Sequence, residues 1–248
     1  MIICKSPSEL ATMREAGRVT ARALRLVGEA VAPGVTTAAL DAIAEEVIRS
    51  AGARPAFKGY HGFPGTICTS VNEQVVHGIP GPTILREGDI ISVDVGAIVE
   101  GYYGDSARTF SVGEVSGQAR SLMDATLRAL EAGTAQCVPG RRLHDISHAV
   151  QSVAEGAGFS VVREYVGHGI GRSMHEDPQL PNFGAPGQGP TLAPGMVFAI
   201  EPMVNAGGAA VRSLDDGWTV VTEDGSPSAH FEHTVAVTDD GPLILTLE

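Results

Sequence analysis

Two apolar runs that each end on an acidic residue stand out in the pattern of hydrophobic and polar positions along this chain. The first, over residues 85–94, ends at Asp94, and the second, over residues 192–201, ends at Glu201. Each run contains a turn glycine before its apolar stretch, and the two runs lie 107 positions apart. An acid inside a strand-like apolar run is costly unless its charge is compensated. The repetition therefore predicts one site assembled from two related halves of the chain.

Other landmarks recur at nearly the same spacing. His61-Gly62 matches His168-Gly169 at a shift of 107, and Pro33-Gly34 matches Pro139-Gly140 at a shift of 106. This period is far longer than that of solenoid repeats. It indicates an internal duplication, in which two halves are related by a pseudo-twofold axis.

Each half begins with helix-like segments. Apolar residues at helical spacing predict helices over residues 38–50 and 144–155, one in each half. A capping box from Ser6 to Glu9, with Pro at the first helical position, opens an earlier helix that we expect to run to about Val31.

Strand-like segments follow the helices, and a Pro- and Gly-rich loop covers residues 182–195. The expected strands cover residues 67–71, 89–99, 105–112 and the region after residue 196. No linker or low-complexity segment separates domains. We therefore expect a single domain over residues 1–248, with pseudo-symmetric halves of about 1–112 and 113–248.

The hairpin that carries Asp94 and Asp105 can be interpreted geometrically. If Val99 and Glu100 form its tip, Asp94 lies directly opposite Asp105, where like charges are destabilising. Glu100 and Gly101 do not form an ideal two-residue turn, so a shift of one or two residues is also open. In the second half Glu201 ends the matching strand. The duplication places Glu232 where Asp105 lies in the first half.

Composition narrows the class of protein. The formal net charge of −12 argues against a nucleic-acid-binding surface, which needs clustered Lys and Arg. The three cysteines, Cys4, Cys68 and Cys137, have neither zinc-ligand spacing nor an even-numbered disulfide framework. We find neither a signal-peptide pattern nor an apolar stretch of membrane-spanning length. The expectation is a cytoplasmic protein with no membrane partner and no specific nucleic-acid partner.

Four carboxylates that converge on one point cannot all stay ionised without compensation. Two divalent cations would supply the matching charge. Oxygen ligands with a histidine favour Mn, Fe, Co or Zn over Mg or Ca. His168 is the best histidine candidate, because the glycines around it let the backbone approach a metal cluster. Two such ions can activate water and polarise a carbonyl, which is the usual equipment for hydrolysis.

The order of these residues resembles that of the type I methionine aminopeptidases, the shortest members of the pita-bread metallopeptidases. The most specific motifs are Asn72 to Pro80, Asp94 with Asp105 eleven residues later, Gly167 to Gly171, and Ile200-Glu201-Pro202. The resemblance covers essentially the whole chain. It implies an α+β pita-bread fold, with a central antiparallel sheet flanked by helices. It also implies an activity that removes N-terminal methionine from nascent proteins and peptides, with a preference for a small second residue.

The resemblance further implies roles for individual residues. Asp94 would hold one metal, His168 and Glu201 the other, and Asp105 and Glu232 would bridge the two. Glu201 would also accept a proton, while His77 and His175 would hydrogen-bond the substrate around the scissile amide. Residues that match the wall of the methionine pocket are Tyr60, Phe63, Cys68 and Trp218.

Other features of the resemblance are weaker or differ from the family pattern. Asn72 and Ser228 match a monovalent-cation site found in some relatives. Met174 stands where an aromatic residue is frequent, and Phe57 stands where many relatives have a smaller residue, so both affect the expected shape of the pocket. Thirty residues lie between Glu201 and Glu232, which leaves no room for the insertion of the type II enzymes.

The histidines outside the motifs are expected to be structural or peripheral. His230 and His233 flank Glu232, and we expect structural roles for both. His61 matches His168 by duplication, but the resemblance does not make it a metal ligand.

Two alternatives stay open. One is a prolidase-like pita-bread hydrolase that cuts before proline; such enzymes usually carry an extra N-terminal domain, for which this chain has no room. The other is a metal-free peptide-binding protein of the same fold, which would typically lack metal ligands. The expected partners are N-terminal methionyl peptides and nascent chains, with possible ribosome association, and the expected oligomeric state is a monomer.

Overall fold

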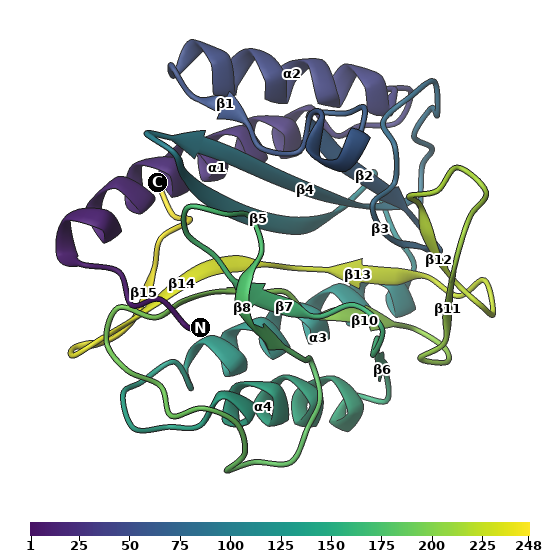
Figure 1. The fold of residues 1–248 in the computed structure, drawn as a ribbon. Coiled ribbons are helices and arrows are strands. Elements are labelled where there is room, and N and C mark those ends of the chain that lie inside the picture. Colours follow the sequence, from purple (N-terminus) through teal and green to yellow (C-terminus); the bar gives the residue numbers. More distant parts are fainter.

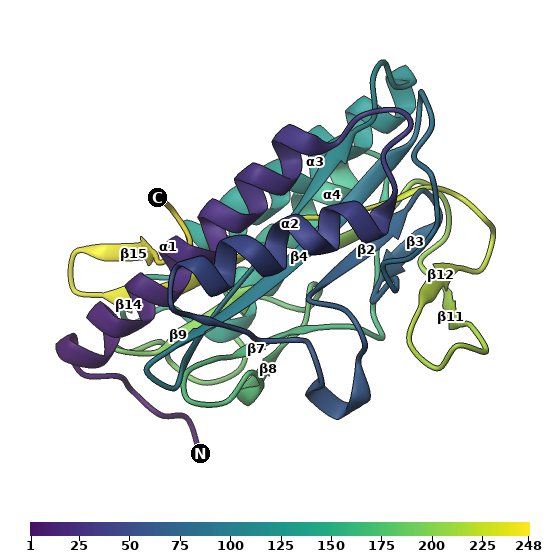
Figure 2. The same ribbon diagram turned by 90° about the horizontal axis from the view of Figure 1, so that it is seen from above.

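The strands of the protein lie between two pairs of helices. The structure is a computed structural model that describes all residues 1–248. Helices α1 and α2 cover one side of the strands, and α3 and α4 cover the other (Figures 1 and 2). Their bounds are α1 Pro7–Ala30, α2 Thr37–Ser50, α3 Gly117–Thr134 and α4 Leu143–Gly156. No helix is long and apolar enough to cross a membrane.

Local sequence explains where the helices begin. The hydroxyl of Ser6 accepts a hydrogen bond from the backbone N–H of Glu9, whose carboxylate accepts one from the N–H of Ser6. This reciprocal capping box confirms the expected start of α1. The side-chain oxygens of Thr36 and Ser116 accept from the N–H groups of Ala39 and Ala119 and so cap α2 and α3 without the reciprocal bond.

All strand pairs are antiparallel and form four small sheets. The first half contains β1 Arg54–Pro55, β2 Ile67–Val71, β3 Gln74–Val76, β4 Ile90–Val99 and β5 Tyr102–Ser111, with a short 3-10 turn, η1, at Tyr60–Gly62. The second half contains β6 Ser160–Val161, β7 Gly167–Gly169, β8 Glu176–Leu180, β9 Val197–Ile200, β10 Met203–Asn205, β11 Val211–Ser213, β12 Val220–Thr222, β13 Ser228–His230, β14 His233–Thr238 and β15 Gly241–Ile244.

The expected register of the β4–β5 hairpin is wrong by two residues. Asp94 pairs with Ala107, and Asp105 pairs with Gly96. The turn is made by Glu100 and Gly101, both at positive φ (49° and 81°), which a two-residue type I′ turn requires. Because strand side chains alternate between faces, the two acids still share one face. As diagonal rather than direct neighbours they repel each other less.

Equivalent contacts in both halves confirm the internal duplication. The isolated bridge between Thr36 and Ile84 has its counterpart between Arg142 and Thr191, at shifts of 106 and 107. Likewise β1 pairs with β4, and β6 pairs with β10.

The halves are joined where β5 runs beside β13 and β14. The Thr109 hydroxyl donates to the carbonyl of His230 and accepts from its N–H, at 2.9 and 2.8 Å. The Thr234 hydroxyl makes the same two bonds with the backbone of Asp105, at 2.8 and 3.0 Å. These reciprocal bonds hold strands from both halves in a fixed register beside each other.

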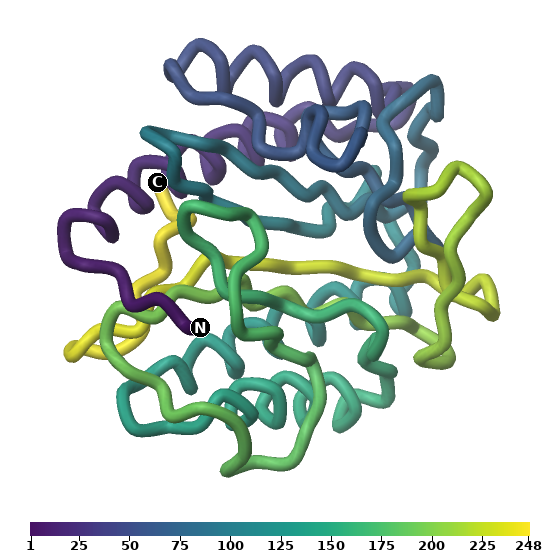
Figure 3. The backbone as a smooth tube through the Cα atoms, in the orientation of Figure 1, coloured from purple at the N-terminus to yellow at the C-terminus, as the bar shows by residue number.

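Each half has its own apolar core beneath its helix pair. Leu24, Leu40 and Ile48 pack with Ile91 and Val93 of β4 in the first half. The equivalent packing in the second half involves Leu122, Ile146, Val150, Phe198 and Ile200. The C-terminal end of the chain runs beside α1 (Figure 3), where the carbonyl of Ile244 accepts from Arg14. Helices outside and antiparallel strands inside agree with the α+β class expected from the sequence.

Candidate metal centre

Five side chains expected to bind metal come from five different segments. Asp94 lies on β4, Asp105 on β5 and His168 on β7, while Glu201 directly follows β9 and Glu232 lies between β13 and β14. All five line one cavity of about 260 Å³. The strands thus bring together residues up to 138 positions apart, from Asp94 to Glu232.

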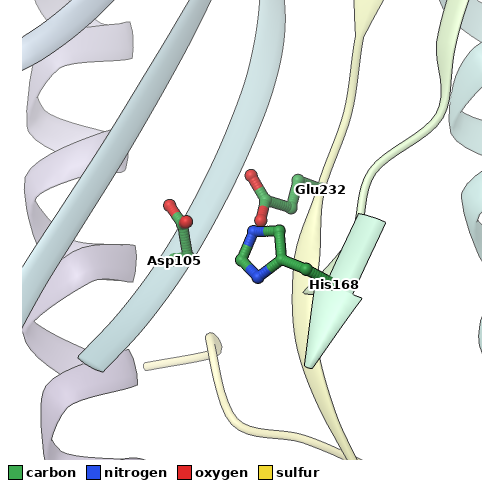
Figure 4. A group of neighbouring side chains, drawn as sticks. All are labelled: Asp105, His168 and Glu232. Atoms are coloured by element: carbon green, nitrogen blue, oxygen red, sulfur yellow. The ribbon is translucent and has the colours of Figure 1, made fainter. Parts of the chain in front are cut away.

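Three of these side chains lie close enough to share one ion. Ligand-type atoms of Asp105, His168 and Glu232 lie within 4.8 Å of one another. Figure 4 shows the three side chains pointing toward one another, from β5, from β7 and from the segment between β13 and β14. All three are buried, with exposed fractions of 2 to 6 %.

One hydrogen bond fixes how His168 can bind. Its Nδ1 lies 2.9 Å from the carbonyl of Gly169, to which only a protonated nitrogen can donate. The lone pair is therefore on Nε2, which lies 3.4 Å from Oε1 of Glu201. Burial lowers the pKa of His168 to about 4, so the imidazole is neutral and able to ligate a metal.

The four acids lack compensating charge from the protein. Burial, followed by the charges of neighbouring carboxylates, raises the pKa of Asp94 and Glu232 well above the usual range, and that of Glu201 rises likewise. Burial also raises the pKa of Asp105. No Lys or Arg pairs with any of them; the only ion-pair partners within 4.0 Å are imidazoles beside Glu201.

Unpartnered oxygen atoms show that this arrangement fits divalent cations. The buried atoms Oδ1 of Asp94, Oδ1 of Asp105 and Oε1 of Glu232 have no hydrogen-bond partner. Buried polar atoms without partners are rare, and ligation by a metal satisfies both the atom and its charge. Four carboxylates and one neutral imidazole are a donor set for a divalent ion of the first transition row.

An apolar wall stands beside the acids. The same cavity is lined by all the expected pocket residues, together with the two that differ from the family pattern: Tyr60, Phe63, Cys68, Trp218, Phe57 and Met174. Phe63 and Trp218 pack edge to face, with ring centroids 5.1 Å apart. Burial raises the pKa of the Cys68 thiol well above its ordinary value, so the thiol is neutral here.

His77 and His175 also face the cavity. The ring of His175 lies 4.3 Å from that of His168, and its Nδ1 lies 2.9 Å from the hydroxyl of Tyr60. Burial, with a smaller contribution from His175, lowers the pKa of His77 to about 4. Burial, followed by the charge of His61, also lowers the pKa of His175, so both rings can act as neutral hydrogen-bonding groups beside the acids.

Strand register corrects the expected equivalence of Glu232 and Asp105. The first-half register places Ala107 opposite Asp94, and the second-half register, continued by one residue, places Glu232 opposite Glu201. Glu232 therefore corresponds to Ala107. The position of Asp105, two residues away on the same face, corresponds to His230. The connection between β9 and β14 is longer than the turn between β4 and β5. Equivalent residues of β14 and β5 are therefore 125 positions apart, whereas equivalent residues of β9 and β4 are 107 positions apart.

The strand register also shows that His61 is not the structural counterpart of His168. His168 lies opposite Ala199, which is 107 positions after Ser92, and the residue opposite Ser92 is Ser70. Ser70 is thus the structural counterpart of His168. His61 lies instead in an exposed turn with φ of 47°, at the mouth of the cavity.

Sequence reasoning missed one residue near the acids. His230 was expected to be structural, but its buried Nε2 has no hydrogen-bond partner and lies 3.8 Å from Oε2 of Glu201. No local motif signals this, because the contact depends on the pairing of β10 with β13. His233 is structural as expected, since its Nδ1 lies 2.9 Å from the hydroxyl of Thr246.

Asn72 and Ser228 lie next to each other outside the cavity lining. The N–H of Ser228 donates to the carbonyl of Asn72 at 2.9 Å, and the Asn72 side chain bonds to Asp89 and to the N–H of Ile90. A monovalent cation at this place stays a prediction.

Comparison with known proteins agrees with this architecture. The model of metallopeptidase family M24 matches residues 11–239. The chain is 56 % identical over 246 residues to methionine aminopeptidase 1 of Bacillus subtilis, with 99 % of each chain covered. It is 54 % identical to methionine aminopeptidase 1 of Mycobacterium tuberculosis, with 98 % of this chain and 94 % of that protein covered.

Solved structures give the same picture. The crystal structure of methionine aminopeptidase from Thermotoga maritima superposes with a TM-score of 0.99 at 48 % identity, and both chains are covered completely. Prolidase from Pyrococcus furiosus shares the fold at a TM-score of 0.81, but only 22 % identity, and 66 % of that chain is covered.

The fold and its acidic cavity thus define a metal-dependent peptidase of the pita-bread class. Within metallopeptidase family M24, the chain belongs to the methionine aminopeptidases. The resemblance inferred from the sequence motifs is confirmed, and with it an aminopeptidase activity that depends on divalent metal.

Proposed function

We propose that the protein removes N-terminal methionine from nascent chains and peptides, using two divalent ions held by the five clustered side chains. The observation that carries this proposal is their convergence on one cavity, where three buried carboxylate oxygens have no hydrogen-bond partner. In the proposed arrangement Asp94 would hold one ion, His168 and Glu201 would hold the other, and Asp105 and Glu232 would be shared between them. The candidate metals are Co, Mn, Fe and Zn.

The bound ions would neutralise the carboxylates, polarise the scissile carbonyl and lower the pKa of the attacking water. Glu201 takes the proton from that water and returns it to the leaving nitrogen. Its position beside His168 on one side and His230 on the other supports this role, because both carboxylate oxygens are held near the cluster.

His77 and His175 hold the scissile amide by hydrogen bonds that strengthen as charge develops on its oxygen. When the Tyr60 hydroxyl donates to Nδ1 of His175, Nε2 of His175 carries the hydrogen and is the donor toward substrate. The apolar wall then receives the methionine side chain, whose flexible thioether adapts to an irregular surface.

The preference for a small second residue, the cytoplasmic location, the monomeric state and a contact with ribosomes are further parts of the proposal. The runner-up activity, cleavage before proline, has only the shared fold in its favour. A metal-free binding function is disfavoured, because no expected ligand is missing from the cavity.

Peptide cleavage tests the proposal directly. The metal-loaded protein should release methionine from Met-Ala-Ser and should not cut Ala-Pro. A Met-Leu-Ser peptide should react much more slowly, and chelation should abolish activity in a way that added divalent metal restores. Cleavage of Ala-Pro without release of methionine would instead support the prolidase-like alternative.

A further inference from the structure

A buried ion pair ties the N-terminal segment to the loop that carries His175. Nζ of Lys5 lies 2.6 Å from Oε2 of Glu176, and the two side chains are only 4 % and 11 % exposed. The ammonium group also donates to the carbonyl of Ile3 at 3.1 Å. Neither Lys5 nor Glu176 lines the cavity.

The backbone of Lys5 is fixed as firmly as its side chain. Its N–H donates to the carbonyl of Gly195 at 2.7 Å, in the turn that leads into β9. A Cβ atom on Gly195 would lie 2.6 Å from the carbonyl oxygen of Lys5, so only glycine permits this approach. The segment before α1 therefore rests on the turn that precedes the strand leading to Glu201.

The other carboxylate oxygen of Glu176 organises the loop itself. Oε1 accepts from the N–H groups of Arg172 and Ser173, at 2.9 and 3.2 Å. A Cβ atom on Gly171 would lie 2.5 Å from Cε of Lys5 and 2.6 Å from Oε1 of Glu176. Loop, carboxylate and ammonium thus fill one small space without room for a side chain at Gly171.

The next two residues of this loop reach the reaction cavity. Met174 is 2 % exposed and lines the apolar wall, and His175 lines the cavity beside His168. Outside the cavity the guanidinium of Arg172 lies 4.3 Å above the ring of Tyr102. The loop is therefore held at its outer side and projects its functional residues inward.

An ion pair of this kind is poorly explained by stability alone. Removing two charges from water costs about as much as their attraction returns, and a well-packed apolar pair is often as stable. What the charged pair adds is a single geometry, because Glu176 must satisfy one ammonium and two backbone N–H groups at once. Exposed pairs such as Arg18–Glu15, with exposed fractions of 52 % and 58 %, impose no such constraint.

We infer that Lys5 and Glu176 are positioning residues that hold the 171–175 loop so that His175 and Met174 face the substrate. This inference rests on the role of His175 in the proposed function. It assigns to the segment before α1 a part in catalysis, although no residue of that segment lines the cavity.

A double-mutant cycle tests the inference. Lys5→Met removes the ammonium and keeps an unbranched stem that reaches as far as Cε. We expect kcat for Met-Ala-Ser to fall by about 10-fold or more, the usual cost of losing a supporting contact. Metal content should not change. In a His175→Ala background the same substitution should lower kcat no further, because Lys5 affects kcat through His175, whereas its effect through Met174 on methionine binding appears in KM. Glu176→Gln is the second variant if Lys5→Met does not fold, because it keeps one acceptor oxygen for the loop amides and replaces the oxygen that faces Lys5 with an NH2 group.

Amide hydrogen exchange gives a readout independent of the chemistry. Exchange of the Arg172 and Ser173 amides should speed up in Lys5→Met, because their acceptor is no longer held. The matched control is Arg18→Met, which breaks an exposed pair on α1 and should leave both exchange and kcat within about twofold of the parent.

The outcomes distinguish the positioning role of Lys5 and Glu176 from the proposed role of His175. Faster exchange with a loss of kcat that disappears in the His175→Ala background supports the inference. Unchanged kcat in Lys5→Met, or an equal further loss in that background, overturns it. Full activity of the His175→Ala single variant would instead contradict the proposed function of His175, and the exchange experiment would still report whether the ion pair orders the loop.

Discussion

The two halves of the molecule share a scaffold but not a set of ligands. Asp94, in the middle of β4, and Glu201, directly after β9, occupy equivalent places, each opposite a returning strand. Around them the equivalent positions differ. Ser70 in the first half corresponds to His168 in the second, Asp105 corresponds to His230, and Ala107 corresponds to Glu232.

The difference shows how a duplicated scaffold can yield an asymmetric metal centre. The first half supplies two aspartates to the cluster, whereas the second supplies two glutamates and the imidazole of His168, with His230 beside Glu201. Strand alternation explains why both sets reach the same cavity, since a displacement of two residues along a strand keeps the side chain on the same face. The backbone symmetry thus fixes where acidic and imidazole side chains can reach the cavity, and the individual residues decide which donor groups each half contributes.

Asp105→Asn tests the first-half contribution and should have the largest effect. The substitution keeps the shape of the side chain but removes a charge proposed to be shared by both ions. We expect activity to fall by about 10²-fold or more, the order found when a single charge-stabilising group of an active site is lost. Steady-state kinetics on Met-Ala-Ser and circular dichroism should show an inactive, folded protein. Asp124→Asn, at an exposed acid of α3, is the matched control, and full activity of Asp105→Asn would contradict the dinuclear arrangement.

His77→Ala tests whether His77, a residue of the first half, contacts the substrate rather than the metal. Loss of one donor to the developing oxyanion should lower kcat by about 10²-fold. Metal stoichiometry, measured by elemental analysis after dialysis, should stay at the value of the parent protein. A variant that loses metal would make His77 a ligand and our assignment wrong.

His168→Ala and His61→Ala compare the two matching histidines of the sequence. Nitrogen raises affinity for late first-row metals, so the site of His168 and Glu201 should fill first and more tightly than the site of Asp94. Titration calorimetry on the metal-free protein should show two phases, of which His168→Ala abolishes the tight one. His61→Ala should keep both phases. Loss of a phase on removing His61 would mean that this exposed residue also binds metal.

His230→Leu tests the least expected difference between the halves. Its imidazole occupies the counterpart of the Asp105 position and faces Glu201, so its loss should lower kcat by about 10-fold, as for other groups that orient a ligand. The control is His233→Leu, because His233 is bonded to Thr246 and does not line the cavity. This substitution should lower the thermal stability and leave kcat almost unchanged. Equal effects of the two substitutions on kcat would show that His230 is merely structural.

Much of the fold could be predicted because its signals are local. The capping box at Ser6, the helical spacing before Gly52 and Gly158, and the apolar runs ending at Asp94 and Glu201 each depend on residues near one another in sequence. Every expected metal ligand and pocket residue lines the cavity. The roles assigned to these residues, and the division of the chain near residue 112, stay predictions.

Register could not be predicted with the same certainty. Side-chain alternation fixes the face of a strand, but a shift of two residues preserves the face and therefore leaves the apolar pattern unchanged. Glu100 adopts a positive φ, so the turn lies one residue later in the sequence than expected. The partner of Asp94 is therefore Ala107, two residues after the expected Asp105. The same ambiguity led to the wrong equivalence between Asp105 and Glu232.

The sequence by itself determined the two-part plan of the protein, the acids that end its two matching apolar runs and the chemistry that so many buried carboxylates require. Those features follow from hydrophobic periodicity and from the cost of burying charge. Only the tertiary structure decided that Ser70 rather than His61 is the counterpart of His168, that His230 faces Glu201, and that Lys5 reaches Glu176. The two contacts join residues far apart in the sequence: His230 and Glu201 are 29 positions apart, and Lys5 and Glu176 are 171 positions apart. No local pattern encodes them, because they arise where separate strands and loops pack together.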